Sequence, residues 1–130
     1  MPLDLAAPML SSRWDAVFTE AEDYYWTMAA RNRCLILSDG ASILGTCTFF
    51  VLSEESDVER FRRRPMWSTP PDAQDGSIIY LDKLATTVWN HRLARAVERE
   101  VSMRVPGWRV ATWYRPTEDV DRRFTYRRRR

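Results

Sequence analysis

The sequence is poor in the residues that build metal and redox sites. Its 130 residues include 2 cysteines, Cys34 and Cys47, and a single histidine, His91. Two thiols and one imidazole are too few for a zinc site without further ligands, so the composition predicts no metal and no other cofactor. We expect the cysteines to be buried, reduced thiols on neighbouring strands.

Long apolar runs are also absent. No stretch approaches the roughly 18 to 20 residues that span a bilayer, and the N-terminus lacks the basic start and apolar core of a signal peptide. These absences predict a cytoplasmic protein, or one packed inside a particle such as a virion.

Lysine is almost missing, because all of the 20 basic residues except Lys83 are arginines. The net charge of +2 conceals an asymmetry, since residues 1–30 are mainly acidic and residues 120–130 mainly basic. Arginine enrichment is typical of GC-rich genomes, and it also suits bidentate binding of phosphate or carboxylate. The candidate contacts for an anionic partner are Arg122, Arg123, Arg127, Arg128, Arg129 and Arg130.

Aromatic residues interleave with arginines near the C-terminus, as in surfaces that bind nucleic acid. They are Trp113, Tyr114, Phe124 and Tyr126. Strand alternation, however, places Trp113 and Tyr114 on opposite faces, and no base-reading motif is present. Nucleic-acid contact therefore stays open beside two alternatives: docking of an acidic protein, and a half-buried hairpin with a solvated basic face.

The length and apolar content predict one domain. A chain of 130 residues with 45% hydrophobic residues can bury one core but is short for two. Residues 1–11 are expected to form a loose lead-in, residues 12–127 the domain, and residues 128–130 a basic tail.

Apolar periodicity and turn residues predict an ordered series of helices and strands. The series is a helix of about 16 residues from Ser12, strands at 34–37 and 43–52 joined by Asp39-Gly40, a short helix capped by Ser53, a strand at 77–85, a helix ending at 105–107, and strands at 108–115 and 120–127. The strand, helix, strand order of the second half permits a parallel pair with a right-handed crossover. The fold class is therefore a mixed α/β sheet of about five strands with helices packed on it.

The strand at 77–85 is apolar on both faces and is predicted to lie in the middle of the sheet. Strict alternation puts Asp82 on one face with Leu84, and Lys83 on the other. A carboxylate among apolar groups is either a catalytic acid or base with a raised pKa, or a structural acid paired with an arginine. His91 follows closely in sequence and is either a surface histidine at a helix start or a base that works with Asp82.

This element order resembles the core of the GNAT acyltransferase superfamily, in which a central strand leads into a helix and then into a splayed strand. The closer similarity is to its toxin-activating lysine acyltransferase branch, which modifies RTX toxins. The stretches that carry the resemblance are residues 35–52, 52–55, 75–85 and 110–116. The resemblance implies a small GNAT-like domain.

Individual positions match that branch in part. Its central strand carries a catalytic Asp before a hydrophobic-Ala pair, and Asp82, followed by Leu84-Ala85, takes the corresponding position. The branch also uses a His ahead of its first helix, where residues 11–14 here contain none. Ordinary acetyl-coenzyme A enzymes place a glycine-rich loop after the central strand. Residues 86–92 contain no glycine, and the toxin-activating branch, which also lacks this loop, takes acyl groups from acyl carrier protein.

The resemblance implies an acyltransferase-like protein, with protein-lysine acyl transfer as the activity and Asp82 and His91 as candidate catalytic residues. Because the usual His and the glycine loop are missing, weak or lost catalysis is expected. The partners would be acyl carrier protein and a protein substrate. The alternative is a non-catalytic structural or interaction protein, such as an internal virion protein of a short-tailed phage with a GNAT-like fold, whose partners would be assembly subunits or further copies of itself.

Overall fold

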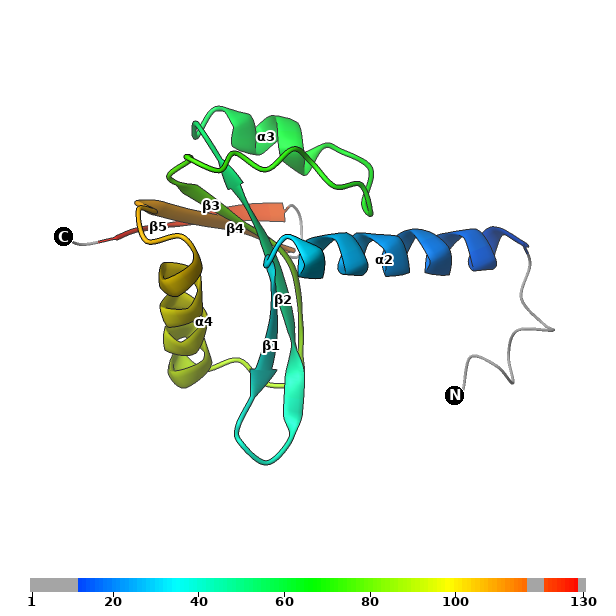
Figure 1. The fold of residues 1–130 in the computed structure, drawn as a ribbon, viewed down its shortest axis with the longest axis horizontal. Coiled ribbons are helices and arrows are strands. Elements are labelled where there is room, and N and C mark those ends of the chain that lie inside the picture. The colour runs from blue at the N-terminus through cyan, green and yellow to red at the C-terminus, as the bar shows by residue number, and fades with distance from the viewer. Residues whose placement is uncertain (1–11, 117–120, 129–130) are drawn as a thin grey trace.

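The computed structural model describes residues 12–116 and 121–128, so the predicted lead-in at 1–11 lies outside the described residues. The elements in chain order are α2 (Ser12–Ala30), β1 (Cys34–Ser38), β2 (Ile43–Leu52), α3 (Asp57–Arg62), β3 (Ile78–Thr86), α4 (His91–Arg104), β4 (Val110–Pro116) and β5 (Asp121–Arg127) (Figure 1). None of the described helices has the length and apolarity that crossing a membrane requires.

The five strands form one mixed sheet in the order β1-β2-β3-β4-β5. Neighbouring strands are antiparallel except β3 and β4, which are parallel and are connected through α4. The predicted mixed α/β sheet and the central place of the strand with Asp82 are therefore confirmed. The predicted hairpin between β1 and β2 is confirmed as well, with Gly40 at a φ of 93° that favours glycine.

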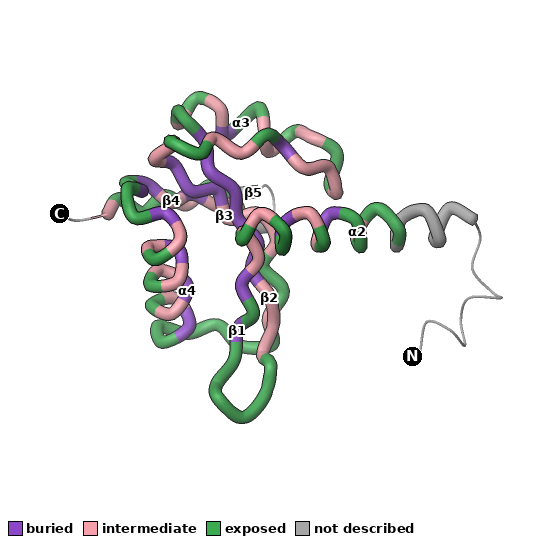
Figure 2. The backbone as a smooth tube through the Cα atoms, in the orientation of Figure 1, coloured by how far each residue is buried: buried purple, intermediate pink, exposed green. Residues whose placement is uncertain are grey.

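Helices cover both faces of the sheet, which explains why β3 is apolar on both sides (Figures 1 and 2). On one face, Ile79 packs in a core with Leu93 and Val97 of α4. On the other face, Tyr80 packs in a second core that holds Tyr24 of α2 and residues of α3. Alternate residues of one strand thus enter two separate cores.

A bulge in β3 overturns the predicted alternation around Asp82. Leu81 pairs with Phe49 and Leu84 pairs with Cys47, so two residues of β3 lie opposite the single Thr48 of β2. The extra residue puts Asp82 and Lys83 on the same face, toward α2, where the Lys83 ammonium lies 5.9 Å from the centre of the Tyr24 ring. Leu84 turns to the α4 side instead.

The short helix α3 also differs from its prediction. It begins at Asp57, and Ser53 does not cap it. The chain first makes a turn in which the Asp57 N–H donates to the Glu54 carbonyl over 3.1 Å. The helix therefore starts one turn later than the Ser-Glu-Glu pattern indicates.

Gly45 allows a close approach between β2 and β3. A Cβ atom there would lie 2.0 Å from the carbonyl oxygen of Ala85, which is a backbone atom that cannot rotate away. We expect Gly45→Ala to lower the free energy of unfolding by about 1–3 kcal/mol, measured by urea denaturation. The control is Gly107→Ala, because a Cβ at Gly107 meets nothing within 4 Å. A Gly45→Ala variant as stable as this control would contradict the prediction.

Candidate functional site

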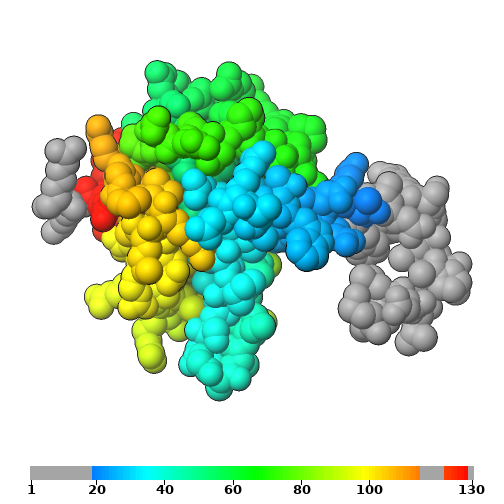
Figure 3. Space-filling view, viewed as in Figure 1, coloured from blue at the N-terminus to red at the C-terminus, as the bar shows by residue number. Residues whose placement is uncertain are grey.

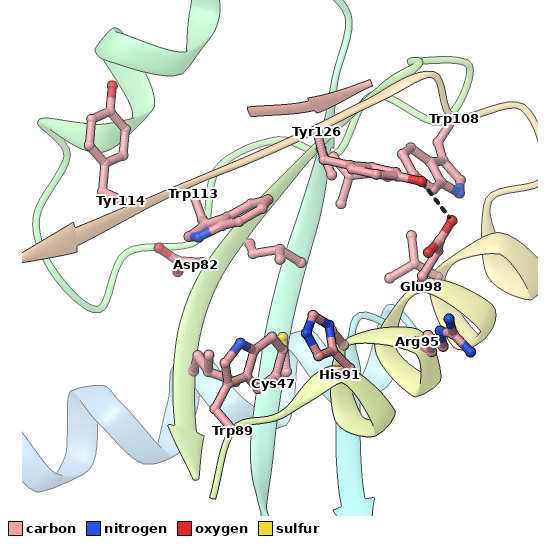
Figure 4. Close-up of a pocket in the computed structure, with 16 residues that line it drawn as sticks. Cys47, Asp82, Trp89, His91, Arg95, Glu98, Trp108, Trp113, Tyr114 and Tyr126 are labelled. Atoms are coloured by element: carbon pink, nitrogen blue, oxygen red, sulfur yellow. Dashed lines mark hydrogen bonds between the residues drawn. The ribbon is translucent and has the colours of Figure 1, made fainter. Parts of the chain in front are cut away.

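A largely apolar cavity opens where the two parallel strands of the sheet diverge. Strands β3 and β4 pair only at Ile78–Val110, Ile79–Ala111 and Tyr80–Thr112, and beyond these pairs they separate. A cavity of about 580 Å³ lies between the separated strands and α4 (Figure 4). This volume falls in the range of cavities that bind small molecules.

Aromatic and aliphatic side chains form most of the cavity wall. Trp113 comes from β4, Tyr126 from β5 and Trp89 from the turn before α4, and Leu81 and Leu84 line the β3 side. Leu84 and Trp89 remain 46% and 40% exposed, so apolar surface continues from the cavity to the solvent. Contiguous exposed apolar surface of this kind is typical of a ligand-binding or partner-binding site.

His91 lies in the cavity wall as the first residue of α4 (Figure 4). Its position is fixed by Asn90, whose side-chain oxygen accepts a hydrogen bond of 3.0 Å from the Leu93 N–H and caps the helix. The His91 ring faces the cavity, so its nitrogens are accessible to a bound molecule. Sequence reasoning identified His91 only through its nearness to Asp82.

Asp82 also borders the cavity, but its carboxylate is held on the opposite face of β3 from His91 (Figure 4). The Asp82 side chain is only 4% exposed and forms an ion pair with Arg64. It also accepts a hydrogen bond from the Tyr24 hydroxyl. Among the described residues, no hydrogen bond or ion pair joins Asp82 to His91, so the structure does not bring the two candidate residues together as a catalytic pair.

The partners of Asp82 are themselves fully engaged. Arg64 donates to the carbonyls of Phe61 and Ser68 over 3.0 and 3.1 Å. The Tyr24 hydroxyl lies 2.7 Å from Thr48 Oγ1, and burial together with the Asp82 charge raises the pKa of Tyr24 far above its ordinary value. This geometry fits a structural role for Asp82, as an acid paired with an arginine. To accept a proton from a substrate, the Asp82 carboxylate would first have to break these bonds.

The C-terminal arginines largely have partners within the chain. Arg127 and Arg123 approach Glu55 within 3.1 and 4.0 Å. The Arg128 side chain donates to the Pro106 carbonyl over 2.8 Å. Its backbone N–H donates to the carbonyl of Arg109, the residue before β4. Of the rest, Arg122 lies over the Phe124 ring, and Arg129 and Arg130 lie outside the described residues. Arg123, Arg127 and Arg128 therefore connect the C-terminal strand to other parts of the chain, whereas Arg122 contacts a residue of its own strand.

A second set of arginines, which sequence reasoning missed, lies on α4 beside the cavity. Arg92, Arg95 and Arg99 are exposed, and Arg95 contributes to the cavity wall. None of the three guanidinium groups has an ion-pair partner within the part of the chain that the structure describes. Their spacing along one side of a helix was the only available signal, and it is common on solvated helices.

The two cysteines are free thiols on neighbouring strands, as predicted, but only Cys47 is buried, because Cys34 at the start of β1 is partly exposed. Cys47 is 1% exposed and lies at the cavity wall. Burial raises the pKa of its thiol to about 12. Cys47 is therefore a protonated, apolar part of the wall at neutral pH.

Stability is expected to fall as the pH rises above about 9. Burial raises the pKa of Cys47 and of Tyr80 to about 12, whereas both groups ionise at their ordinary values of 9.0 and 10.0 in the unfolded chain. The folded state then binds more protons, so each group costs on the order of 1.4 kcal/mol of unfolding free energy per pH unit above its unfolded pKa. Urea denaturation at pH 8 to 11 should show this decline, and Cys47→Val should make it shallower between pH 9 and 10. Parallel curves for the two proteins would contradict the assignment to Cys47.

In comparisons with protein-family models, curated proteins and solved structures, nothing matches this chain. Among residues 12–116 and 121–128, no group of three or more His, Cys, Asp or Glu side chains is placed to hold a metal ion. Arguments about function therefore start from the cavity and from the groups around it.

Proposed function

We propose that the chain is an acyltransferase-like protein whose cavity binds the acyl chain of a thioester donor. The observation that carries the proposal is the apolar cavity opened by the divergence of β3 and β4. Its wall of tryptophan and leucine side chains suits an unbranched apolar chain, and it is large enough to take one. The resemblance to the GNAT acyltransferases supports the same function, since there too the central strand leads into a helix and then into a splayed strand.

His91 is the group that would act as the base. An acceptor amine would attack the thioester carbonyl, forming the C–N bond and breaking the C–S bond, while the amine proton passes to His91 and the thiolate leaves. His91 faces the cavity, whereas Asp82 is held by Arg64 and Tyr24. In this proposal, Asp82 positions β3 and does not touch the donor.

Acyl binding is tested with S-lauroyl-N-acetylcysteamine, a neutral acyl thioester, followed by the fluorescence of the cavity tryptophans. The variant Ala94→Phe places a ring in the cavity wall and is expected to weaken binding at least tenfold. The matched control is Ala29→Phe at an exposed position of α2. Equal affinities of both variants and the parent protein would contradict binding in this cavity.

A structural or interaction role is the second candidate, and a different observation favours it. Helix α2 extends away from the sheet, and Trp26 on it is 70% exposed (Figures 1 and 3). Tyr24 and Met28, in its later turns, enter the core. An exposed tryptophan on an extended helix suits a protein partner, such as an assembly subunit. This role predicts that the acyl thioester does not bind and that Trp26→Ala abolishes a stoichiometric complex.

A further inference from the structure

The exposed side of α2 combines two carboxylates with a large apolar side chain. Glu22 and Asp23 lie four and three positions before Trp26, so the three residues occupy one side of the helix. Trp26 lies two positions from Tyr24 and from Met28, which enter the core, so this side points away from the core. All three side chains are exposed, and residues 19–30 contain no basic residue that could neutralise the carboxylates along the helix. We call Glu22, Asp23 and Trp26 the acidic face of α2.

The exposed side of α4 has the opposite charge and an apolar side chain of its own. Arg92, Arg95 and Arg99 are spaced three and four residues apart and lie along one side of the helix. Met103 follows on the same side, four positions after Arg99, and is 70% exposed. The three arginines are exposed as well. We call these four residues the basic face of α4.

The acidic residues of α4 do not neutralise its basic face. Glu98 accepts a hydrogen bond of 3.4 Å from the Tyr126 hydroxyl. Glu100 lies 3.9 Å from Arg104, which is not part of the basic face. Like charges three or four residues apart destabilise a helix slightly, and no ion pair within the described residues offsets this for the three arginines. An acidic surface from outside the chain would offset it.

A single chain cannot bring its acidic face and its basic face together. Helix α2 packs into the core on the Tyr80 side of the sheet, and α4 packs into the core on the Ile79 side. Figures 1 and 2 show the two helices separated by the sheet, with α2 extending away from it. The two faces can therefore pair only between two chains.

The two faces also share one spacing. On α2 a carboxylate lies four positions before Trp26, and on α4 an arginine lies four positions before Met103. When the two helices run parallel with Trp26 opposite Met103, Glu22 lies opposite Arg99. In an antiparallel pair with the same apolar contact, Ala30 would take that place. A tryptophan ring against a methionine sulfur is a favourable contact, and tryptophan is enriched among the residues that dominate interface affinity.

We infer that the acidic face of α2 binds the basic face of α4 on a second copy of the chain. The contact is head-to-tail, so each chain uses its two faces on two different neighbours, and the assembly either closes into a ring or stays open. The inference goes beyond acyl binding. It rests on the structural role proposed as the second candidate, and it names a second copy as the partner of the exposed Trp26.

Sedimentation velocity of the full chain tests the self-association. At about 50 mM salt the average mass should rise above that of the monomer between about 5 and 500 μM protein, since association follows mass action. The association should weaken about tenfold or more at about 500 mM salt, because salt screens the charges of the two faces. Trp26→Ala should weaken it about 30-fold or more, as expected for a tryptophan at the centre of a contact.

Two variants that each remove one face test the head-to-tail contact. One carries Glu22→Gln and Asp23→Asn, and the other carries Arg92→Gln, Arg95→Gln and Arg99→Gln. Each variant alone should associate at least about tenfold more weakly than the parent protein. Their equimolar mixture should form a 1:1 complex with the affinity of the parent contact. This complex cannot grow, because only one acidic face and one basic face remain intact, and its formation shows that both variants are folded.

The control variant carries Arg63→Gln and Asp75→Asn, which remove exposed charges outside α2 and α4 and should leave the association unchanged. A monomeric parent protein, a face variant that associates as strongly as the parent, or a mixture that forms no complex overturns the inference. A monomeric parent that forms a Trp26-dependent complex with a different protein also overturns it, although the structural role then stands. Acyl binding is measured separately with S-lauroyl-N-acetylcysteamine, so its failure is distinguishable from failure of self-association.

Discussion

Replacing Asp82 with asparagine is expected to lower the free energy of unfolding by about 3–5 kcal/mol. The Asp82 and Arg64 side chains are 4% and 11% exposed, so the substitution leaves a buried guanidinium charge without its counter-charge. The bond from Tyr24 to the carboxylate is weakened at the same time. Urea denaturation followed by tryptophan fluorescence measures the loss.

A double-mutant cycle separates the ion pair from other effects of the substitution. Arg64→Met alone should also destabilise, and the double variant should lose less than the sum of the single variants, with a coupling of about 1–3 kcal/mol. The control pair is Asp57 and Arg60, which lie 3.1 Å apart at the surface with Arg60 72% exposed. Asp57→Asn should cost less than about 1 kcal/mol. A small loss for Asp82→Asn, similar to that of Asp57→Asn, would show that the buried pair does not hold β3 in place.

The sequence was sufficient for the sheet because its signals are local. Asp39-Gly40 between two apolar runs marks the first hairpin, and an apolar run flanked on one side by Asp75-Gly76 marks the central strand. Pro106-Gly107 marks the end of α4. Each signal depends on residues a few positions apart, and each element exists in the structure near its predicted place.

The bulge in β3 and the cavity could not be predicted from local sequence signals. The bulge depends on the pairing of Leu81 and Leu84 with β2, and residues of β2 are more than 30 positions away in the sequence. Nothing in the strand itself shows that the alternation breaks between Asp82 and Lys83. The cavity depends on where β3 and β4 stop pairing, and the last paired residues, Tyr80 and Thr112, are also far apart in the sequence.

The candidate site was therefore only partly predictable. Asp82 and His91 both border the cavity, but nearness in sequence says nothing about the face of the sheet on which each side chain lies. The C-terminal arginines looked available because their main partner, Glu55, is about 70 residues earlier in the chain. The arginines of α4 were missed, because arginines spaced along one side of a helix are common on solvated helices.

Replacing His91 with glutamine is expected to slow acyl transfer by about 10²- to 10⁴-fold, because the proposed base is lost. The assay incubates the protein with S-lauroyl-4′-phosphopantetheine and a lysine-containing peptide, and mass spectrometry follows the acylated peptide. Acyl binding should be largely retained, because the apolar side chains of the cavity wall stay in place and glutamine fits at a helix start. The comparison with Asp82→Asn is decisive at a temperature where both variants are folded, because that substitution should leave the rate per folded molecule nearly unchanged.

Equal rates for His91→Gln and the parent protein would remove His91 from the chemistry. If the parent protein binds the acyl thioester without measurable transfer, the cavity holds an acyl chain in a protein that has lost catalysis. That outcome would agree both with the resemblance to the acyltransferases and with the absence of a histidine at residues 11–14.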